Sequence, residues 1–407
     1  MIVVLAFLLI VVGLAAWIVK VAGWRFALNR LGSALLIVVI VTFATSVLLR
    51  QASVDEQQSL ALEEVGLPAT AQPCVAALGT GADVETVLEC VDERGLENNA
   101  FAQYAGWAGD ALSGDLGYAF YKNKEPLTTT LAQRMPRTAW LFLYSQLIAL
   151  VLAVPLGIWA AYQAGRGGRV VPRWLLPAIV VAMLAVAFGL GWGVAAVLLL
   201  GVATPIVVYN FIRGGRPGDV TVNTLAFVLL SIPVFVLGES LRYLFAIRRD
   251  WYQLTGYEPW SEGVGAHLGS VWLPAVVLGL AATPVYLRLL RADMIQNLQQ
   301  DFVSVAKAKG MSNTHILFRH VLRPSTVTLL TVAGLNIAQL VNGAIVVEFI
   351  YDYDGMGSYL IDAVARKEFF AIQTLVALVA ILFVPANTIV DMLYTVVDPR
   401  VRAEATT

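Results

Sequence analysis

The sequence has few charged residues and few residues of the kinds that build catalytic or metal sites. Only 14% of its 407 residues are charged, whereas 58% are hydrophobic and the mean hydropathy is +0.74. This composition excludes an ordinary soluble domain and predicts a protein that crosses a membrane several times. The net charge of −1 hides a segregation of basic and acidic residues along the chain, and this segregation predicts the topology.

Several sequence patterns of enzymes are missing. No Gly-x-x-x-x-Gly-Lys-Ser/Thr phosphate loop occurs, so a partner must supply any energy from ATP. The three histidines do not form a His-x-x-x-His zinc pair, because His315 and His320 are five residues apart and His267 is distant. No nucleophile-elbow pattern is present either. The sequence therefore predicts no catalytic residue, no cofactor and no metal site.

Cysteine is also scarce, and the two that occur are Cys74 and Cys90, both in a polar segment near the N-terminus. The topology below places this segment outside the cytosol, where an oxidising compartment permits a disulfide. Cys74 and Cys90 are therefore a candidate disulfide, and two unpaired small residues are the alternative.

Long apolar runs are abundant. Residues 2–22 can span a bilayer, and no basic region precedes them, which predicts a retained helix rather than a cleaved signal peptide. Lys20, Arg25 and Arg30 mark a cytoplasmic turn after this span, which places the N-terminus outside. We expect an extra transmembrane helix in residues 1–24 and a first core helix in residues 25–49.

Residues 50–137 lack a run long enough to span and contain thirteen acidic residues against six basic ones, which predicts a small external domain. A later apolar stretch at 174–212 has arginines at both ends and glycines in its middle. It predicts an inserted hairpin that leaves and re-enters the cytoplasm. With the remaining runs, the sequence predicts an all-α polytopic membrane protein with about nine transmembrane helices.

One polar stretch between two apolar spans, within the cytoplasmic loop 292–324, has a helical pattern. Phe302, Val305, Ala306 and Lys309 are spaced as on one face of a short helix, and Gly310 stands where a glycine would end it. Ser312 can cap a second helix. A solvated Ala/Lys face is one alternative, and a DNA-binding helix-turn-helix is another. Enclosure between membrane spans argues against the DNA-binding alternative.

The same stretch contains Asp301-Phe302-Val303, Ala306-Lys307-Ala308-Lys309-Gly310 and Arg319-His320-Val321-Leu322-Arg323. It resembles the cytoplasmic coupling loop of ABC importer permeases of the oligopeptide/dipeptide/nickel family, with Pro324 where that family usually has Asn. The resemblance implies that an ATPase subunit docks on this loop. It implies these ATPase-coupling residues: Asp301, Phe302, Val305, Ala306, Ala308, Lys309, Gly310, Arg319 and His320.

Further stretches resemble external motifs of the same family. They are Gly114-Asp115-Leu116-Gly117, with Ala119 in place of the family's Ser, and the segment from Glu348 to Gly355-Met356-Gly357. The motif residues are Gly114, Asp115, Gly117, Glu348, Gly355 and Gly357. Asp354 stands at the family's proline position, so we expect a more mobile segment there. Asp398-Pro399-Arg400 is a further match near the C-terminus.

The resemblance implies a six-helix type I permease core, made of the first core helix at 25–49 and helices of a permease domain at 138–402, followed by a tail at 403–407. It implies a multi-pass subunit of a prokaryotic inner (plasma) membrane, with the C-terminus in the cytoplasm. The expected partners are a second homologous permease, two ABC ATPase subunits, an extracytoplasmic solute-binding protein and the lipid bilayer, with no nucleic acid. Members of the family move peptides, nickel complexes, glutathione or sugars.

A secondary transporter is the alternative function. It would need charged residues inside the membrane for ion coupling. The predicted spans contain very few, with Arg242 and Asp391 near their ends.

Overall fold

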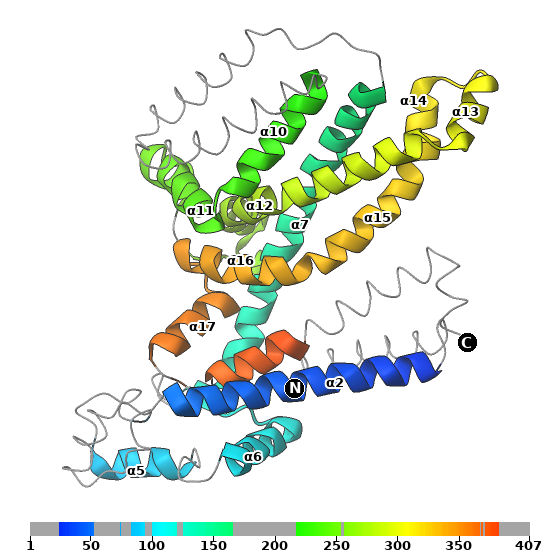
Figure 1. The fold of residues 1–407 in the computed structure, drawn as a ribbon. Coiled ribbons are helices and arrows are strands. Elements are labelled where there is room, and N and C mark those ends of the chain that lie inside the picture. Colours follow the sequence, from blue (N-terminus) through cyan, green and yellow to red (C-terminus); the bar gives the residue numbers. More distant parts are fainter. Residues whose placement is uncertain are drawn as a thin grey trace. The chain divides into compact units, whose positions relative to one another are not determined.

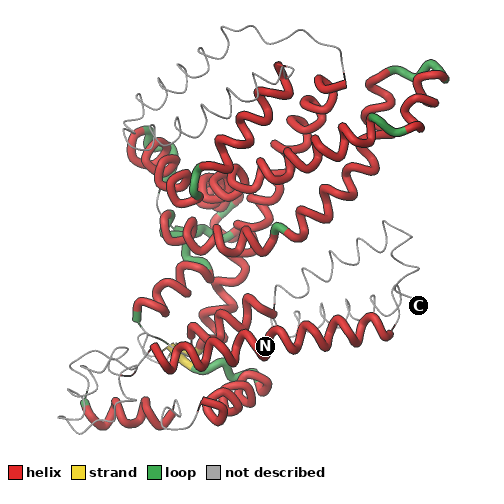
Figure 2. The backbone as a smooth tube through the Cα atoms, in the orientation of Figure 1, coloured by secondary structure: helices red, strands yellow, loops and turns green. Residues whose placement is uncertain are grey.

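The computed structural model describes residues 24–52, 74, 83–93, 100–119, 125–165, 217–253, 256–366, 368 and 371–381. The predicted first span at 2–22 and the insertion at 174–212 lie outside these residues. Helices joined by loops make up most of the described chain, and its two strands of two residues each, β1 (Tyr118–Ala119) and β2 (Glu125–Pro126), pair antiparallel (Figure 2). The prediction of an all-α membrane protein is confirmed.

Two described helices are long and apolar enough to cross a membrane, Leu127–Gln163 and Val264–Leu298. A third crossing is possible if the bent pair Leu225–Ser231 and Val234–Arg248 forms one span. The described residues therefore hold two or three of the predicted spans, and the total of nine stays a prediction.

The chain divides into two compact units, and the first contains residues 1–138 and 354–407. Its buried core includes Leu127, Leu131, Met356, Tyr359 and Leu375. The described elements of this unit are α2 (Trp24–Ala52), α5 (Val84–Glu93), α6 (Ala100–Ser113), β1, β2, the start of α7 (Leu127–Gly165), α17 (Met356–Ala365) and a helix at Ala371–Ile381.

The second unit contains residues 139–353. Its central element is α12 (Val264–Leu298), which packs against α10, α11, α15 and α16. The other described elements are the rest of α7, α10 (Pro217–Ser231), α11 (Val234–Arg242), η3 (Tyr243–Arg248), η4 (Trp260–Glu262), α13 (Asp301–Ala308), α14 (Asn313–His315), η5 (Ile316–Val321), α15 (Leu322–Leu335) and α16 (Ile337–Ile350). Figure 1 shows α13 and α14 at the far ends of α12 and α15.

The chain bends by 96° between α10 and α11. Pro233 is the N-cap of α11, and its ring and missing N–H prevent the α10 ladder from continuing through it. The Ser231 hydroxyl donates to the Phe227 carbonyl at 2.7 Å, which satisfies one of the carbonyls left free at the end of α10.

A second break in the helical chain lies at Asn336, where α15 and α16 meet. The Asn336 amide donates to the Tyr286 hydroxyl at 3.1 Å, and this hydroxyl donates to Gln146 Oε1 at 2.9 Å. Gln146 Nε2 in turn donates to the Ala333 carbonyl at 3.2 Å, near the end of α15. Polar groups inside an apolar bundle need such partners, and this network joins α7 and α12 to the helix break.

Candidate functional site

The stretch at 301–311 forms a short helix that ends at a glycine, as the sequence predicts. Gly310 follows α13 with φ +77°, in the left-handed region. Its N–H donates to the Lys307 carbonyl at 2.9 Å, and the Met311 N–H donates to the Ala306 carbonyl at 3.2 Å. These two bonds form a Schellman motif, which satisfies the carbonyls at the end of the helix and fixes the direction of the following chain.

The second helix starts at a side-chain cap. Ser312 Oγ accepts a hydrogen bond from the His315 N–H at 3.3 Å, so the predicted Ser312 cap is confirmed. The helix then continues through α14 and the π-helical turns of η5 into α15. Pro324 has no N–H to donate to the His320 carbonyl four residues earlier. The π-helical turns of η5 lie just before this missing backbone hydrogen bond.

The two helices place apolar side chains on both sides of this segment. Val303, Ile316, Leu317 and Val321 are buried in the core of the second unit. By contrast, Phe302 is 41% exposed, and Val305 and Phe318 are each 53% exposed. The inward side chains hold the segment on α12 and α15, so the outward ones stand on a well-supported surface.

Ala306 differs from the prediction, which placed it on the docking face with Phe302 and Val305. It is only 6% exposed and belongs to the core of its own unit. The Schellman motif brings Met311 back toward Ala306, and Met311 packs against the same core. Substituting Ala306 would therefore disturb packing within the subunit, whatever docks outside.

Most of the remaining predicted coupling residues are exposed around these apolar side chains. Asp301 lies in the first turn of α13, where a negative charge is favourable for the helix dipole. Ala308, Lys309 and Arg319 are exposed and His320 is half-buried. The ring of His320 lies 5.8 Å from that of His315. Phe302, Val305 and Phe318 are thus exposed apolar side chains of a segment that also exposes Lys309 and Arg319; we call these three residues the 302–318 surface.

The predicted external motifs lie elsewhere in the chain. Gly114 and Gly117 both have positive φ, +94° and +80°, and the Asp115 carboxylate accepts from the Gly117 N–H at 2.9 Å. These are the features of a tight turn after α6, which explains the two glycines structurally. Glu348 is completely buried.

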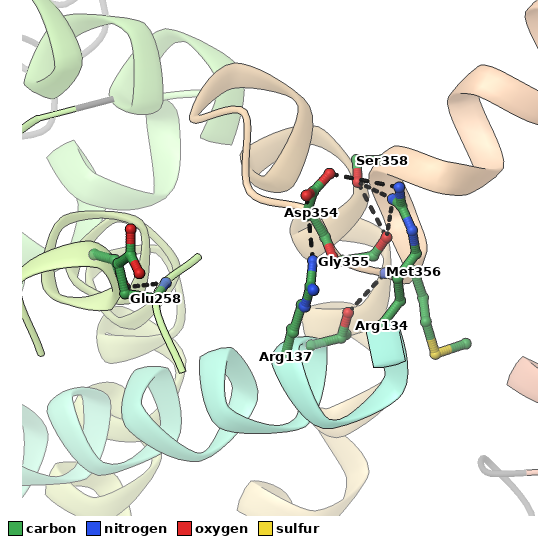
Figure 3. A network of polar contacts seen from close by, with 9 residues as sticks. Arg134, Arg137, Glu258, Asp354, Gly355, Met356 and Ser358 are labelled. Atoms are coloured by element: carbon green, nitrogen blue, oxygen red, sulfur yellow. Dashed lines mark hydrogen bonds and ion pairs between the residues drawn. The ribbon is translucent and has the colours of Figure 1, made fainter. Parts of the chain in front are cut away.

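Asp354 is held by two arginines of α7 that the sequence analysis did not single out. Its carboxylate lies 3.5 Å from Arg134 Nη2 and 3.2 Å from Arg137 Nη1 (Figure 3). Arg134 also donates to the Gly355 carbonyl at 3.1 Å, and the Met356 N–H donates to Thr138 Oγ1 at 2.9 Å. We call Arg134, Arg137 and Asp354 the Asp354 clasp. The sequence predicted a more mobile segment here, whereas the structure shows the segment fastened to α7.

The Asp354 clasp predicts a small, salt-sensitive coupling between two side chains. In a double-mutant cycle, Arg137→Gln and Asp354→Asn should show an interaction of about 0.2 to 1 kcal/mol, because Asp354 is 58% exposed and its charge is screened. The measurement is the thermal midpoint of the purified protein at low and high salt. Arg242→Gln with Glu239→Gln, an exposed pair at 2.9 Å within one helix, is the control. Strictly additive losses would show that Asp354 and Arg137 are not coupled.

Two further features escaped the sequence analysis. His267 is fully buried, with Nδ1 2.8 Å from the Glu258 carbonyl and Nε2 3.2 Å from the Tyr144 hydroxyl, and its ring stacks on Trp260. In the same region burial raises the pKa of the Tyr252 phenol well above its ordinary value, so Tyr252 stays a donor to the Ser270 carbonyl. These contacts fix the loop between η3 and α12. The aromatic and histidine residues at 248–270 were the sequence feature from which these contacts could have been predicted.

Cys74 is fully buried and disulfide-bonded. The side chain of Cys90 lies outside the described residues, so the pairing of these two cysteines stays a prediction.

Comparison with known families gives a match to the model of the binding-protein-dependent transport system inner membrane component over residues 201–403. The match includes the 302–318 surface and most of the second unit.

Individual proteins are similar over most of the chain. A probable peptide ABC transporter permease protein of Sinorhizobium fredii is 27% identical, over 82% of this chain and 90% of its own. An oligopeptide transport system permease protein of Bacillus subtilis is 26% identical, over 76% and 83%. A glutathione transport system permease protein of Pectobacterium atrosepticum is 27% identical, over 81% and 89%.

Proposed function

Since the chain belongs to the family of inner membrane components of binding-protein-dependent transport systems, we propose that it forms the translocation path for short peptides or a related small solute. It is a permease subunit of an ABC importer and not an enzyme, located in the inner membrane with several passes. The family also implies ATPase and solute-binding-protein partners.

ATP hydrolysis by the partner subunits is coupled to transport through the 302–318 surface. The observation that supports this proposal is that Phe302, Val305 and Phe318 stand exposed on a segment whose inner face is firmly packed. Exposed apolar side chains on a short amphipathic helix suit the groove of a partner protein. Lys309 and Arg319, exposed on the same segment, add electrostatic selectivity for an acidic rim.

The proposed assembly contains this permease, a second homologous permease, two ATPase subunits and an external binding protein. Within the chain, residues 1–24 are an extra helix, 25–49 the first core helix, 50–137 an external domain, and 138–402 the permease domain with the hairpin 174–212. The N-terminus lies outside and the C-terminus in the cytoplasm. The segregation of basic residues supports this orientation.

Short peptides are the proposed substrate class because relatives are named as peptide and oligopeptide permeases. A glutathione permease among the relatives extends the class to modified small peptides. A secondary transporter remains the second candidate, and the buried carboxyl of Glu348 favours it, because ion-coupled carriers use such groups.

The test is retention of the ATPase subunits by the purified permease. Phe302→Ser combined with Val305→Ser should release them, because the substitutions remove two of the three apolar side chains of the 302–318 surface. Phe101→Ser, at a 71% exposed residue of α6, is the matched control and should retain them. Peptide uptake into liposomes by this chain alone, without ATPase subunits, would refute the importer and support the secondary transporter.

A further inference from the structure

A pocket of about 570 Å³ lies between α10, α12 and α15 in the second unit. Asn223 and Phe227 line it from α10, and Arg288 and Arg291 line it from α12. The Arg288 guanidinium lies over the Phe227 ring, 4.7 Å from the ring centre. Both arginines lie outside the 302–318 surface.

The pocket changes from polar to apolar along its length. α10 runs from residue 217 to the bend at Pro233. α12 starts on the side of that bend and runs to α13, so the two helices have opposite directions (Figure 1). Because Phe227 faces Arg288, Leu230 lies near the level of Val285, and Asn223 near that of Arg291. The two arginines therefore lie toward one end of the pocket and Leu230 and Val285 toward the other, and Leu289, Ala292 and Val332 complete the lining.

Two of the apolar lining residues are also exposed on the surface of the unit: Leu230 is 41% exposed and Val285 is 36% exposed. In a membrane protein such side chains face the lipid tails. Arg288 stands ten residues before the end of α12, about 15 Å along the helix from the segment that contains the 302–318 surface. On the proposed topology, on which this step rests, that depth is the headgroup level of the cytoplasmic leaflet.

Among the described residues, none accepts a hydrogen bond from the Arg288 guanidinium. A guanidinium offers five N–H groups, and in the described part of the chain its only recorded partner is the face of Phe227. The nearest acidic residue on α12 is Asp293, whose carboxylate accepts from Asn297 Nδ2 at 3.0 Å. A planar guanidinium held over an aromatic ring is well suited to bind a phosphate through two hydrogen bonds.

We propose that this pocket binds one anionic phospholipid of the cytoplasmic leaflet. Arg288 and Arg291 contact the phosphate, and the acyl chains lie along Leu230 and Val285. Basic pockets between transmembrane helices bind anionic headgroups in this way, and the gradient of the lining matches the gradient of a lipid molecule. The lipid thereby joins α10 to α12 next to the bend at Pro233.

The experiment counts lipids bound to the purified ATPase–permease complex by native mass spectrometry during titration with phosphatidylglycerol or phosphatidylcholine. One phosphatidylglycerol should bind in preference to phosphatidylcholine. Arg288→Gln should weaken that binding roughly fivefold, since each basic residue at a membrane surface contributes about that factor. Arg249→Gln is the matched control, because Arg249 also lies over an aromatic ring, that of Trp251, but outside the pocket. This control should bind phosphatidylglycerol as the unchanged protein does.

Two other outcomes would overturn the proposal. Equal binding of phosphatidylcholine, unaffected by Arg288→Gln, would mean that only tail contacts exist. Displacement of the bound phosphatidylglycerol by millimolar inorganic phosphate would assign the pocket to a free anion. The number of bound lipids is measured without ATP and without transport. A negative result would therefore refute the lipid site and leave the proposed importer function intact. If the ATPase subunits dissociate, the lipids bound to the permease can still be counted.

Discussion

Gly310→Val should stop substrate uptake by the complete importer, whereas Gly310→Asn should leave most of it. Gly310 has φ +77°, a conformation that a β-branched residue adopts only with strain and that asparagine tolerates. A Cβ at this position meets no atom within 4 Å, so the difference between the two variants reports backbone strain and not a clash. This makes Asn an unusually well matched control.

The strain costs about 1 to 2 kcal/mol, which lowers the population of the docked conformation roughly five- to thirtyfold. Relief of the strain changes the direction of the chain after α13 and turns Phe302 and Val305 away from a partner. The measurement is substrate uptake together with ATP hydrolysis in liposomes that contain the complete complex. We expect hydrolysis without uptake, or a fall in both, with normal insertion of the permease. Uptake at the unchanged rate in Gly310→Val would show that the 302–318 surface does not couple hydrolysis to transport.

Gly279→Ala should destabilise the permease, because α7 and α12 touch at this glycine. A Cβ there would lie 2.8 Å from Ile148 Cγ2, 2.9 Å from Ile148 Cβ and 3.0 Å from the Ser145 carbonyl oxygen. None of these atoms is the end of a flexible side chain, and Ile148 is stiff because it branches at Cβ. The two helices must therefore move apart, and such overpacking costs about 1 to 3 kcal/mol.

The control is Gly269→Ala on the same helix, where a Cβ meets nothing within 4 Å. It should be neutral or slightly stabilising, since alanine favours a helix over glycine by up to about 1 kcal/mol. The thermal midpoint of the detergent-solubilised complex measures the stability of the Gly279→Ala and Gly269→Ala proteins. Gly279→Val, with its larger side chain, should lower the yield of folded permease further. A Gly279→Ala protein as stable as Gly269→Ala would contradict the close helix contact.

Local rules decided much of the candidate site. The helix at 301–308, its left-handed glycine and the Ser312 cap each depend on residues within five positions of one another, so the sequence predicts them correctly. The apolar composition likewise predicts a helical membrane protein without any knowledge of packing.

The sequence by itself therefore determined the class of the protein, its family motifs and the two-helix form of the segment with the 302–318 surface. Only the tertiary structure decided which side of that segment is free, because the burial of Ala306 depends on the core it joins. The tertiary structure also decided that Arg134 and Arg137 hold Asp354, at the position where the family has a proline. It likewise decided that the Asn336 amide donates to the Tyr286 hydroxyl. These contacts join residues from 50 to more than 200 positions apart. No spacing in the sequence specifies such contacts, because they depend on how the helices pack.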